Sequence, residues 1–518
     1  MNTLNTTGKN SYDLHLRDSN FSIIILEVIL LEKLKGLTKQ TIVYGFGNIM
    51  VRMLTFILLP FYMHVLPKAE YGIAILVLTF IAFMNHVYRY GMDSAILKFY
   101  SNTDDQDAKQ KILSSGFYLN LITSLILSAF LLFLQKPIGS FLISNGVDNS
   151  ALYIRFAAFI LFFDCLSWIP MALLRLKERP RLFLAIRLVE VSLNLGLNIY
   201  FVVILRIGIK GIFLSTLISA FTKFFLLFLT MIKDLSLTFS GKKAKELLLF
   251  GLPLMPTGLI LSAMQLVNRS FVIKKYLGAD DLGLYGAGYK LGKFMMLVSV
   301  AFYYAWQPFF LKSGVNKESK QLFSRVLTYF TFVGLYLWLG LTLFIRQIAN
   351  LHIGDKYLIN PEYHASIQIV PYLLLAFVFY GVYQIFLPGI YHKKKTKYIA
   401  LNMLVAGIVN VGLNFLLVPR IGILGASFGT LTGFIVLAYL TYWKSQQLIK
   451  IEYEYFRIFT LIVIFIPIGL ICFYLKVAII IRIVTFLLIP IILYISNFFR
   501  PEEVKYLKKL INRSAMQN

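Results

Sequence analysis

Long apolar stretches recur along the whole of this 518-residue sequence, and they constrain its fold more than any other feature. A helix needs about 20 consecutive apolar residues to cross the hydrocarbon core of a bilayer. Runs of this length occur more than a dozen times here. Only helices and closed barrels satisfy their backbone hydrogen bonds in lipid, and runs this long indicate helices. The sequence therefore predicts an all-α protein that crosses a membrane many times.

The composition excludes several other classes of protein. The chain is 58% hydrophobic and only 14% charged, whereas soluble domains are about 45–50% apolar and about 25% charged. A soluble enzyme, a disordered protein and a secreted disulfide scaffold are excluded. The two cysteines, Cys165 and Cys472, both lie in apolar runs, where a thiol behaves as a small hydrophobic side chain.

We predict about fourteen membrane-spanning helices in two lobes of six, followed by two more. The predicted spans are 38–66, 71–95, 112–134, 150–174, 182–204, 211–232, 247–272, 282–310, 324–345, 366–388, 398–418, 422–442, 458–475 and 478–498. The predicted parts of the chain are a cytoplasmic leader with an interfacial helix (1–37), an N-lobe (38–232), a C-lobe (247–442), a C-terminal helix pair (458–498) and a cytoplasmic basic tail (499–518).

Basic residues are unequally distributed between alternate loops. If the N-terminus is cytoplasmic, the cytoplasmic loops hold 31 lysines and arginines and the opposite loops hold 10. Short loops rich in these residues remain on the cytoplasmic side of a membrane. We therefore predict that both termini are cytoplasmic. The net charge of +27 is then a topology signal, and no nucleic-acid partner is expected.

Two segments of the chain repeat in the same order. Asn194-Leu-Gly-Leu-Asn198 returns as Asn410-Val-Gly-Leu-Asn414, and each copy precedes an Arg-Ile-Gly-Ile turn. The turns start at Arg206 and Arg420. The matching segments are six spans apart, so both copies enter the membrane in the same direction. This pattern predicts parallel lobes related by a pseudo-two-fold axis along the membrane normal.

Several ordered motifs resemble one transporter superfamily. They are Pro60-Phe-Tyr62 with Glu70-Tyr-Gly72, Phe250-Gly-Leu-Pro253, Asn268-Arg269 where the family has Asp-Arg, Gly283-Leu-Tyr285 with Tyr289-Lys290, and Pro419-Arg-Ile-Gly422. Together they resemble the multidrug/oligosaccharidyl-lipid/polysaccharide (MOP) exporter superfamily, in particular its polysaccharide-transporter branch. The resemblance covers roughly residues 38–500.

The resemblance implies a flippase for lipid-linked oligosaccharides of the O-antigen or capsule type. Such a protein lies in the bacterial cytoplasmic (inner) membrane and serves the biosynthesis of cell-surface polysaccharides, lipopolysaccharide among them. Its partners would be a polyprenyl-phosphate-linked glycan, membrane lipids, and polysaccharide polymerases or glycosyltransferases. The resemblance also implies that the first two helices of each lobe line a central cavity.

Ten basic residues fall inside the predicted spans rather than in loops. A cation near the bilayer centre costs about 2.5–3.5 kcal/mol, so it needs water, a partner or a ligand. Arg155, Arg325 and Arg482 lie near span ends and can extend to the interface. Arg187 is one helical turn from Glu190 and can pair with it. For Lys223 a structural role and a ligand-binding role both remain open.

The other cations form the predicted substrate site. Its cationic members are Arg52, Arg89, Arg269, Lys290 and Lys293, with Asn48, Asn85, Asp93, Gln265 and Tyr289 as supporting polar residues. Asn85, Arg89 and Asp93 recur at helical spacing and would form one polar stripe. Interhelical salt bridges are the alternative interpretation. That alternative is weakest in spans 247–272 and 282–310, which hold no acidic residue. A permanently positive cavity suits a phosphate group.

The sequence contains no signature of an enzyme. It has no Gly-x-x-x-x-Gly-Lys-Ser/Thr loop for a nucleotide, and its six histidines lack metal-ligand spacing. We expect no cofactor and no metal site. A coupling cation, Na⁺ or H⁺, would act at Asp93 or Glu190.

Alternating access of the two lobes would move the lipid-linked oligosaccharide between leaflets. Two other functions remain open: a cation- or proton-coupled multidrug antiporter of the same superfamily, and a non-transporting membrane scaffold of a glycan-assembly complex. An antiporter site should be rich in acids, and the deep acids are limited to Asp93, Asp164 and Glu190.

Overall fold

The computed structural model describes residues 56–143, 149–495 and 498–500. The regular secondary structure within these residues is helical apart from one two-stranded ribbon. Eleven helices are long and apolar enough to cross a membrane, and the one over Gly258–Leu311 covers two predicted spans. Two shorter apolar helices, Phe56–Val65 and Ile479–Ile495, correspond to the first and last predicted spans. The predicted helical membrane fold is confirmed.

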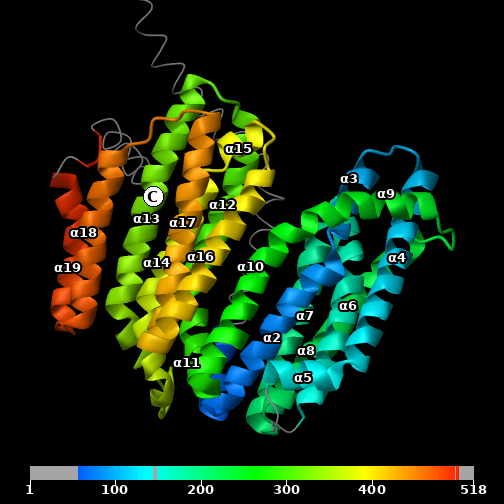
Figure 1. The fold of residues 1–518 in the computed structure, drawn as a ribbon, viewed down its shortest axis with the longest axis horizontal. Helices are drawn as coiled ribbons and strands as arrows, with labels where there is room; N and C mark the ends of the chain where they lie inside the picture. The colour runs from blue at the N-terminus through cyan, green and yellow to red at the C-terminus, as the bar shows by residue number, and fades with distance from the viewer. Residues whose placement is uncertain (1–55, 144–148, 496–497, 501–518) are drawn as a thin grey trace, which may run out of the picture.

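The helices of the first lobe follow one another in the blue to green part of Figure 1. They are α2 (Lys68–Arg89), α3 (Met92–Ser101), α4 (Gln106–Phe133), α5 (Gln135–Ile143), α6 (Ser150–Leu176), α7 (Pro180–Asn198) and α8 (Ile209–Met231). A short helix, α9 (Gly241–Gly251), follows and lies across the end of this lobe.

The second lobe occupies the centre of Figure 1. It contains α10 (Met255–Val267), α11 (Lys274–Gly292), α12 (Phe294–Ser313), α13 (Lys317–Ala349), α14 (Val370–Ile385), α15 (Pro388–His392), α16 (Lys397–Ile421) and α17 (Ile423–Leu448). The last pair, α18 (Tyr455–Tyr474) and α19 (Ile479–Ile495), lies at the outer edge of this lobe. Trp338 of α13 packs against Gly469 of α18.

Two breaks were not predicted. The span expected over 71–95 is divided, because Tyr90 and Gly91 leave the helical conformation and Gly91 has a φ of 75°. Asp93 therefore lies on α3, beyond the break, although its carboxylate still pairs with Arg89 of α2. The span expected to begin at 247 is also divided, since Pro253 follows the end of α9 and a new helix begins at Met255.

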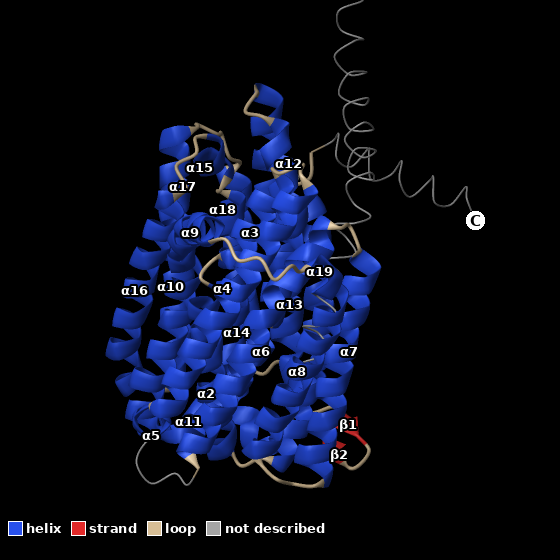
Figure 2. Cartoon of the chain, turned by 90° about the vertical axis from the view of Figure 1, so that its right-hand side faces the viewer, coloured by secondary structure: helices blue, strands red, loops and turns tan. Residues whose placement is uncertain are grey.

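The bundle has two distinct ends (Figure 2). One end carries α3, α9 and α15, and we call it the basic end because lysines predicted to be cytoplasmic, such as Lys98, Lys242 and Lys393, belong to it. The other end carries strands β1 (His352–Ile353) and β2 (Lys356–Tyr357), which pair antiparallel with His352 opposite Tyr357. We call it the hairpin end. The predicted leader and most of the predicted basic tail lie outside the described residues.

The lobes close against each other at the hairpin end. A Cβ on Gly72 of α2 would lie 2.2 Å from the Ala279 carbonyl oxygen, and one on Gly283 would lie 2.2 Å from that of Lys68. Only glycine permits so close an approach of two helix backbones. The Tyr363 hydroxyl donates to the Leu66 carbonyl at 3.1 Å, which adds a bond between the lobes.

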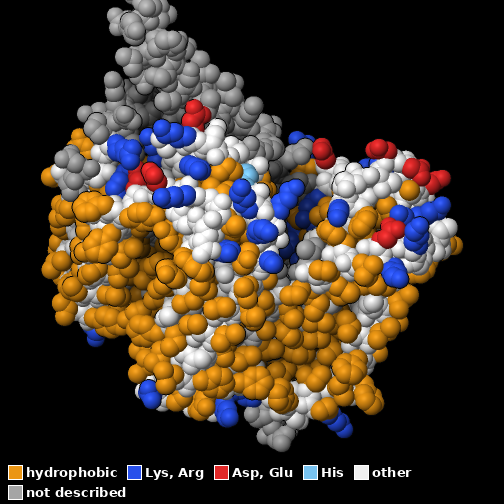
Figure 3. Space-filling view, turned by 45° about the horizontal axis from the view of Figure 1, so that its top comes forward, with side chains coloured by type: hydrophobic (Ala, Val, Ile, Leu, Met, Phe, Trp, Pro, Cys, Tyr) orange, Lys and Arg blue, Asp and Glu red, His pale blue; other side chains and the backbone are white. Residues whose placement is uncertain are grey.

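Further bonds strengthen the closure at the hairpin end. The His64 ring donates to the Tyr357 carbonyl oxygen at 2.6 Å, which joins the first lobe to strand β2. The Lys274 ammonium donates to the Leu142 carbonyl oxygen, also at 2.6 Å. At the basic end, Figure 3 shows lysine and arginine side chains around a hollow between the two halves. The structure is therefore closed at the hairpin end and open toward the basic end.

Candidate functional site

Two cations of the second lobe lie at its boundary with the first. The Arg269 guanidinium donates to the hydroxyl of Thr79 on α2, and it stacks on the Tyr289 ring at 4.8 Å from the ring centre. The Lys290 ammonium lies 5.5 Å from the centre of the Tyr62 ring, which belongs to the first lobe. The partners of both cations in these contacts, a hydroxyl and two aromatic rings, carry no charge.

The depth of this pair in the membrane follows from the length of α2. Thr79 is 11 residues beyond Lys68, where the helix begins, which corresponds to about 16 Å at about 1.5 Å per residue. The hydrocarbon core is about 30 Å thick. Arg269 therefore contacts the first lobe near the middle of the membrane, where transporter sites between repeats are commonly found.

Neither cation has an acidic partner in the part of the chain that the structure describes. Every ion pair found there involves other residues. A cation at this depth is costly unless it faces water or a ligand. Among the described residues, Arg269 and Lys290 together thus provide a positive charge between the lobes that no acid compensates.

Local structure explains how Arg269 is aimed at α2. Residues Asn268–Ile273 form a π-helical turn after α10, and such turns are frequent at functional sites. The buried Asn268 amide donates to the Asn410 side chain at 2.5 Å, which anchors the turn to α16. Asn414 donates in turn to the Asn410 carbonyl at 2.7 Å. One of the repeated asparagine segments therefore supports the turn that carries Arg269.

The corresponding segment of the first lobe supports Tyr62. The Tyr62 hydroxyl donates to Asn198 at 2.6 Å, and Asn198 donates to the Asn194 carbonyl at 2.8 Å. These bonds hold the ring that faces Lys290. Each repeated segment thus fixes a residue at the boundary between the lobes.

Arg89 and Asp93 pair with each other, as the alternative interpretation of salt bridges expects. Arg89 donates to both carboxylate oxygens of Asp93, with Nε at 2.8 Å from Oδ1. Arg175 of α6 lies 4.0 Å from the same carboxylate. The Arg89 guanidinium also stacks on Trp168, 4.0 Å from the ring centre. The Arg89 side chain remains 33% exposed, so its ion pair with Asp93 does not bury it fully.

A second ion cluster lies deeper in the first lobe. The Lys223 ammonium donates to Asp164 at 2.5 Å and to Glu190 at 2.9 Å. Arg187 completes the cluster with a bond of 2.6 Å to Glu190. Two cations therefore balance two carboxylates. Asn85 joins this cluster to the first one, since it donates to Asp164 at 3.3 Å and accepts from Trp168 at 3.4 Å.

The predicted site residues therefore divide into groups. Arg269, Lys290 and Tyr289 meet at the lobe boundary, while Asn85, Arg89, Asp93 and Glu190 belong to the charge clusters of the first lobe. Gln265 is one turn before Arg269, and Lys293 lies at the junction of α11 and α12. Asn48 and Arg52 lie outside the described residues.

Several residues of these clusters were not among the predicted site residues. Thr79 and Trp168 carry no signal of their own, because a single threonine or tryptophan in an apolar span is usually a packing residue. Tyr62 belongs to one of the motifs that resemble the superfamily, but the motif predicts no role for it. Asp164 was noted as a deep acid, but only the structure places it against Lys223.

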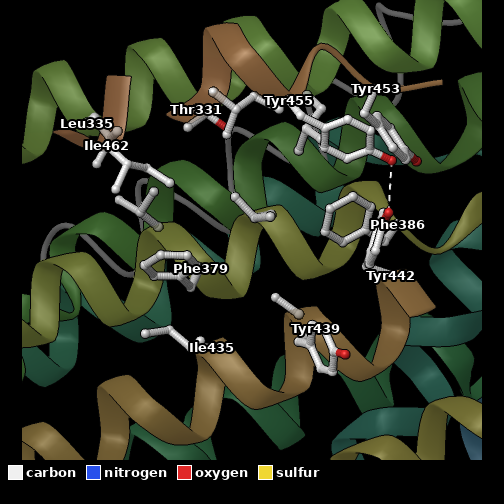
Figure 4. Close-up of a pocket in the computed structure, with 15 residues that line it drawn as sticks. Thr331, Leu335, Phe379, Phe386, Ile435, Tyr439, Tyr442, Tyr453, Tyr455 and Ile462 are labelled. Atoms are coloured by element: carbon white, nitrogen blue, oxygen red, sulfur yellow. Dashed lines mark hydrogen bonds between the residues drawn. The ribbon is translucent and has the colours of Figure 1, made fainter. Parts of the chain in front are cut away.

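An apolar cavity of about 260 Å³ lies apart from these charges (Figure 4). Residues of α13, α14, α17 and α18 line it, including Leu335, Phe379 and Ile435. Tyr442 and Tyr455 close one side with a hydroxyl–hydroxyl bond of 2.8 Å. No charged side chain lines the cavity, so it is not a phosphate site.

The sequence matches the model of one protein family, described as "Polysaccharide biosynthesis protein", over residues 63–360. No protein with a curated description matches the chain.

Several solved structures have a similar fold. The lipid II flippase MurJ in an inward closed conformation aligns with a TM-score of 0.70 at 15% identity, covering 88% of this chain and 99% of MurJ. An inward-facing multidrug resistance MATE family transporter of the MOP superfamily aligns with a TM-score of 0.62 at 16% identity, covering 82% and 99%. An outward-facing MATE structure gives 0.57 at 16% identity, covering 82% and 96%.

Proposed function

Because this chain belongs to the polysaccharide biosynthesis protein family, we propose that it is a flippase for a polyprenyl-phosphate- or polyprenyl-diphosphate-linked oligosaccharide. The fold is that of MATE and MurJ transporters, and the resemblance to the MOP superfamily is confirmed. The proposed reaction moves the substrate from the inner to the outer leaflet of a bacterial cytoplasmic membrane. Its product would serve cell-surface polysaccharide assembly, of the O-antigen or capsule type.

The observation that carries this proposal is the uncompensated pair of Arg269 and Lys290 between the lobes. A phosphate presents several charged oxygens, and charge-assisted hydrogen bonds are about twice as strong as neutral ones. The planar guanidinium can bind two oxygens at once, while the ammonium acts as a compact charge. A diphosphate linkage could therefore bridge the two cations. The glycan would extend into the hollow at the basic end, and the polyprenyl chain would remain in lipid.

The arrangement of the lobes supports an alternating-access mechanism. The hollow between the two halves lies at the basic end, which we propose faces the cytoplasm because short loops rich in lysine and arginine stay on that side. In this proposal the lipid-linked head group enters from that side. Opening of the contacts at Gly72 and Gly283 would then release it toward the opposite leaflet.

Coupling to a cation is part of the proposal, with Asp93 and Glu190 as candidate groups. Both carboxylates are held by cations of the same lobe. Protonation of Asp93 would release Arg89, and protonation of Glu190 would release Arg187 and leave Lys223 bonded to Asp164 alone. A proton could in this way change the packing of α2 against α6. Polysaccharide polymerases and glycosyltransferases remain proposed partners.

The test is reconstitution of the full chain in liposomes with a fluorescent polyprenyl-diphosphate oligosaccharide. A membrane-impermeant reductant destroys fluorescence in the outer leaflet, and further loss reports translocation. We expect translocation of this lipid but not of labelled phosphatidylcholine. Ion-driven uptake of a cationic drug, without glycolipid movement, would support the multidrug antiporter. Movement of neither substrate would favour the scaffold.

A further inference from the structure

Arg269 and Lys290 both contact the opposite lobe, although they belong to the same one. Arg269 donates to Thr79, and that hydroxyl donates its own proton to the Ile75 carbonyl at 2.6 Å. The threonine oxygen is therefore oriented as an acceptor for Arg269. Thr79 is 3% exposed, so the bond is sheltered from water.

The contact of Lys290 is fixed in a similar way. Its partner Tyr62 is buried, and the bond to Asn198 prevents the ring from turning away. The ring attracts the ammonium through a cation–π interaction. Two cations at the middle of the membrane thus hold the second lobe to two prepositioned residues of the first.

The contacts of the two cations lie close along the chain to the closure at the hairpin end. Gly72 is two helical turns before Thr79 on α2, and its partner segment around Gly283 is two turns before Lys290 on α11. α2 and α11 therefore carry the backbone contact at Gly72 and one member of each cation contact, Thr79 on α2 and Lys290 on α11. Because each cation belongs to the second lobe and each partner to the first, separation of the two lobes at this boundary would break the contacts of Arg269 and Lys290.

We propose that Thr79 and Tyr62 form a substrate-released interlock, in which a phosphate group takes Arg269 from Thr79 and Lys290 from Tyr62. This inference rests on the proposed function, because it requires phosphate at the two cations. Phosphate replaces neutral partners with charged oxygens, which bind both cations more strongly. The cations then have partners in both conformations, and the lobes lose two contacts that favour closure. A ligand shifts an equilibrium only by its differential affinity for the two states, and this exchange of partners supplies that difference.

The experiment measures the separation of the lobes at the hairpin end. Spin labels at Lys210→Cys in the first lobe and Asp355→Cys in the second report their distance by double electron–electron resonance. The background carries Cys165→Ala and Cys472→Ala, and the full chain is held in lipid nanodiscs. The probe is a polyprenyl diphosphate, with the matching polyprenol as its uncharged control. Binding of the diphosphate is measured in parallel.

We expect the diphosphate, but not the polyprenol, to increase the population with separated labels. Thr79→Val should raise that population without ligand by about two- to tenfold, as the loss of one neutral hydrogen bond predicts. Thr79→Ser keeps the hydroxyl and should behave as the parent protein does. Tyr62→Leu removes the ring and should act in the same direction as Thr79→Val, which provides a second test if one variant folds poorly.

Two outcomes would overturn the proposal in different ways. If Thr79→Val and Tyr62→Leu leave the distances unchanged while the diphosphate still binds and separates the labels, the interlock is wrong and the phosphate site stands. If the parent protein does not bind the diphosphate, the proposed function fails and the interlock fails with it.

Discussion

Gly208 and Gly422 have the same backbone conformation, with φ of 64° and 62° and ψ of −144° in both. They occupy corresponding turns of the two lobes, between α7 and α8 and between α16 and α17. Only glycine adopts this region without strain. The two copies of the Arg-Ile-Gly-Ile turn therefore share one backbone conformation. Each copy has glycine at this position because other residues would be strained there.

Alanine at Gly422 should destabilise the protein by about 1–3 kcal/mol, the cost of a side chain in a glycine-only conformation. No atom lies within 4 Å of a Cβ placed there, so the effect isolates backbone strain. The measurement is thermal unfolding in detergent. Gly412→Ala is the matched control, because that glycine is helical and equally open; it should be neutral or slightly stabilising. Equal stability of the two variants would contradict the account.

Replacement of Lys223 by methionine should destabilise the first lobe by about 3–5 kcal/mol, because the removal of one partner leaves buried charge unpaired. Asp164 would lose its ammonium partner, and Glu190 would keep only Arg187. Folded yield and unfolding temperature measure the effect. Adding Asp164→Asn to Lys223→Met should restore much of the loss, since it removes the uncompensated carboxylate. A double variant as unstable as the single one would argue against charge pairing.

Alanine at Gly72 or Gly283 should force the hairpin end open, since its Cβ would overlap backbone atoms that cannot move aside. Spin labels at both Lys210→Cys and Asp355→Cys, as above, would report longer distances without any ligand. Gly196→Ala is the control, because nothing lies within 4 Å of its Cβ. Unchanged distances in both glycine variants would mean that this close approach does not hold the lobes together.

The predicted orientation places the basic end in the cytoplasm. Reporter fusions within the loop at Ser240 and at the hairpin residue Gly354 should therefore give opposite results, with the first active only in the cytoplasm. A fusion at Asn518 should match the first. The reverse pattern would show that the split of 31 to 10 basic residues misassigns the two sides, and entry of substrate would then have to be argued from the other end.

Much of the helical fold could be predicted, because apolar runs of bilayer length have one stable backbone solution in lipid. The breaks within these helices could not be predicted from the sequence. Tyr90 is an ordinary residue in a helix, and its departure from helical geometry depends on Gly91 packing against the backbone of Gly251. No periodicity in either segment carries that information, since the two glycines meet only in the folded chain.

The candidate site could be predicted only where charge made residues conspicuous. Arg269 and Lys290 stood out because their spans contain no acid. Thr79 is 190 residues from Arg269 in the chain, and Tyr62 is 136 residues from Asn198. Such contacts depend on how distant helices pack within and between the lobes, and periodicity in a single sequence does not show that packing. Arg89 stood out equally, but its pairing with Asp93 makes it the weaker candidate for binding phosphate.

The measurement that tests the central claim most directly is glycolipid translocation by Arg269→Ala and Lys290→Ala, normalised to correctly inserted protein. Each should reduce translocation about tenfold to a hundredfold, as loss of a charge-assisted contact of about 1.5–3 kcal/mol predicts. Arg269→Lys should recover part of it, because charge returns without the planar geometry. Arg155→Ala is the control, since that arginine is exposed and bonds to Gln135. Translocation at the parent rate by the Arg269→Ala/Lys290→Ala double variant would contradict a phosphate site between the lobes.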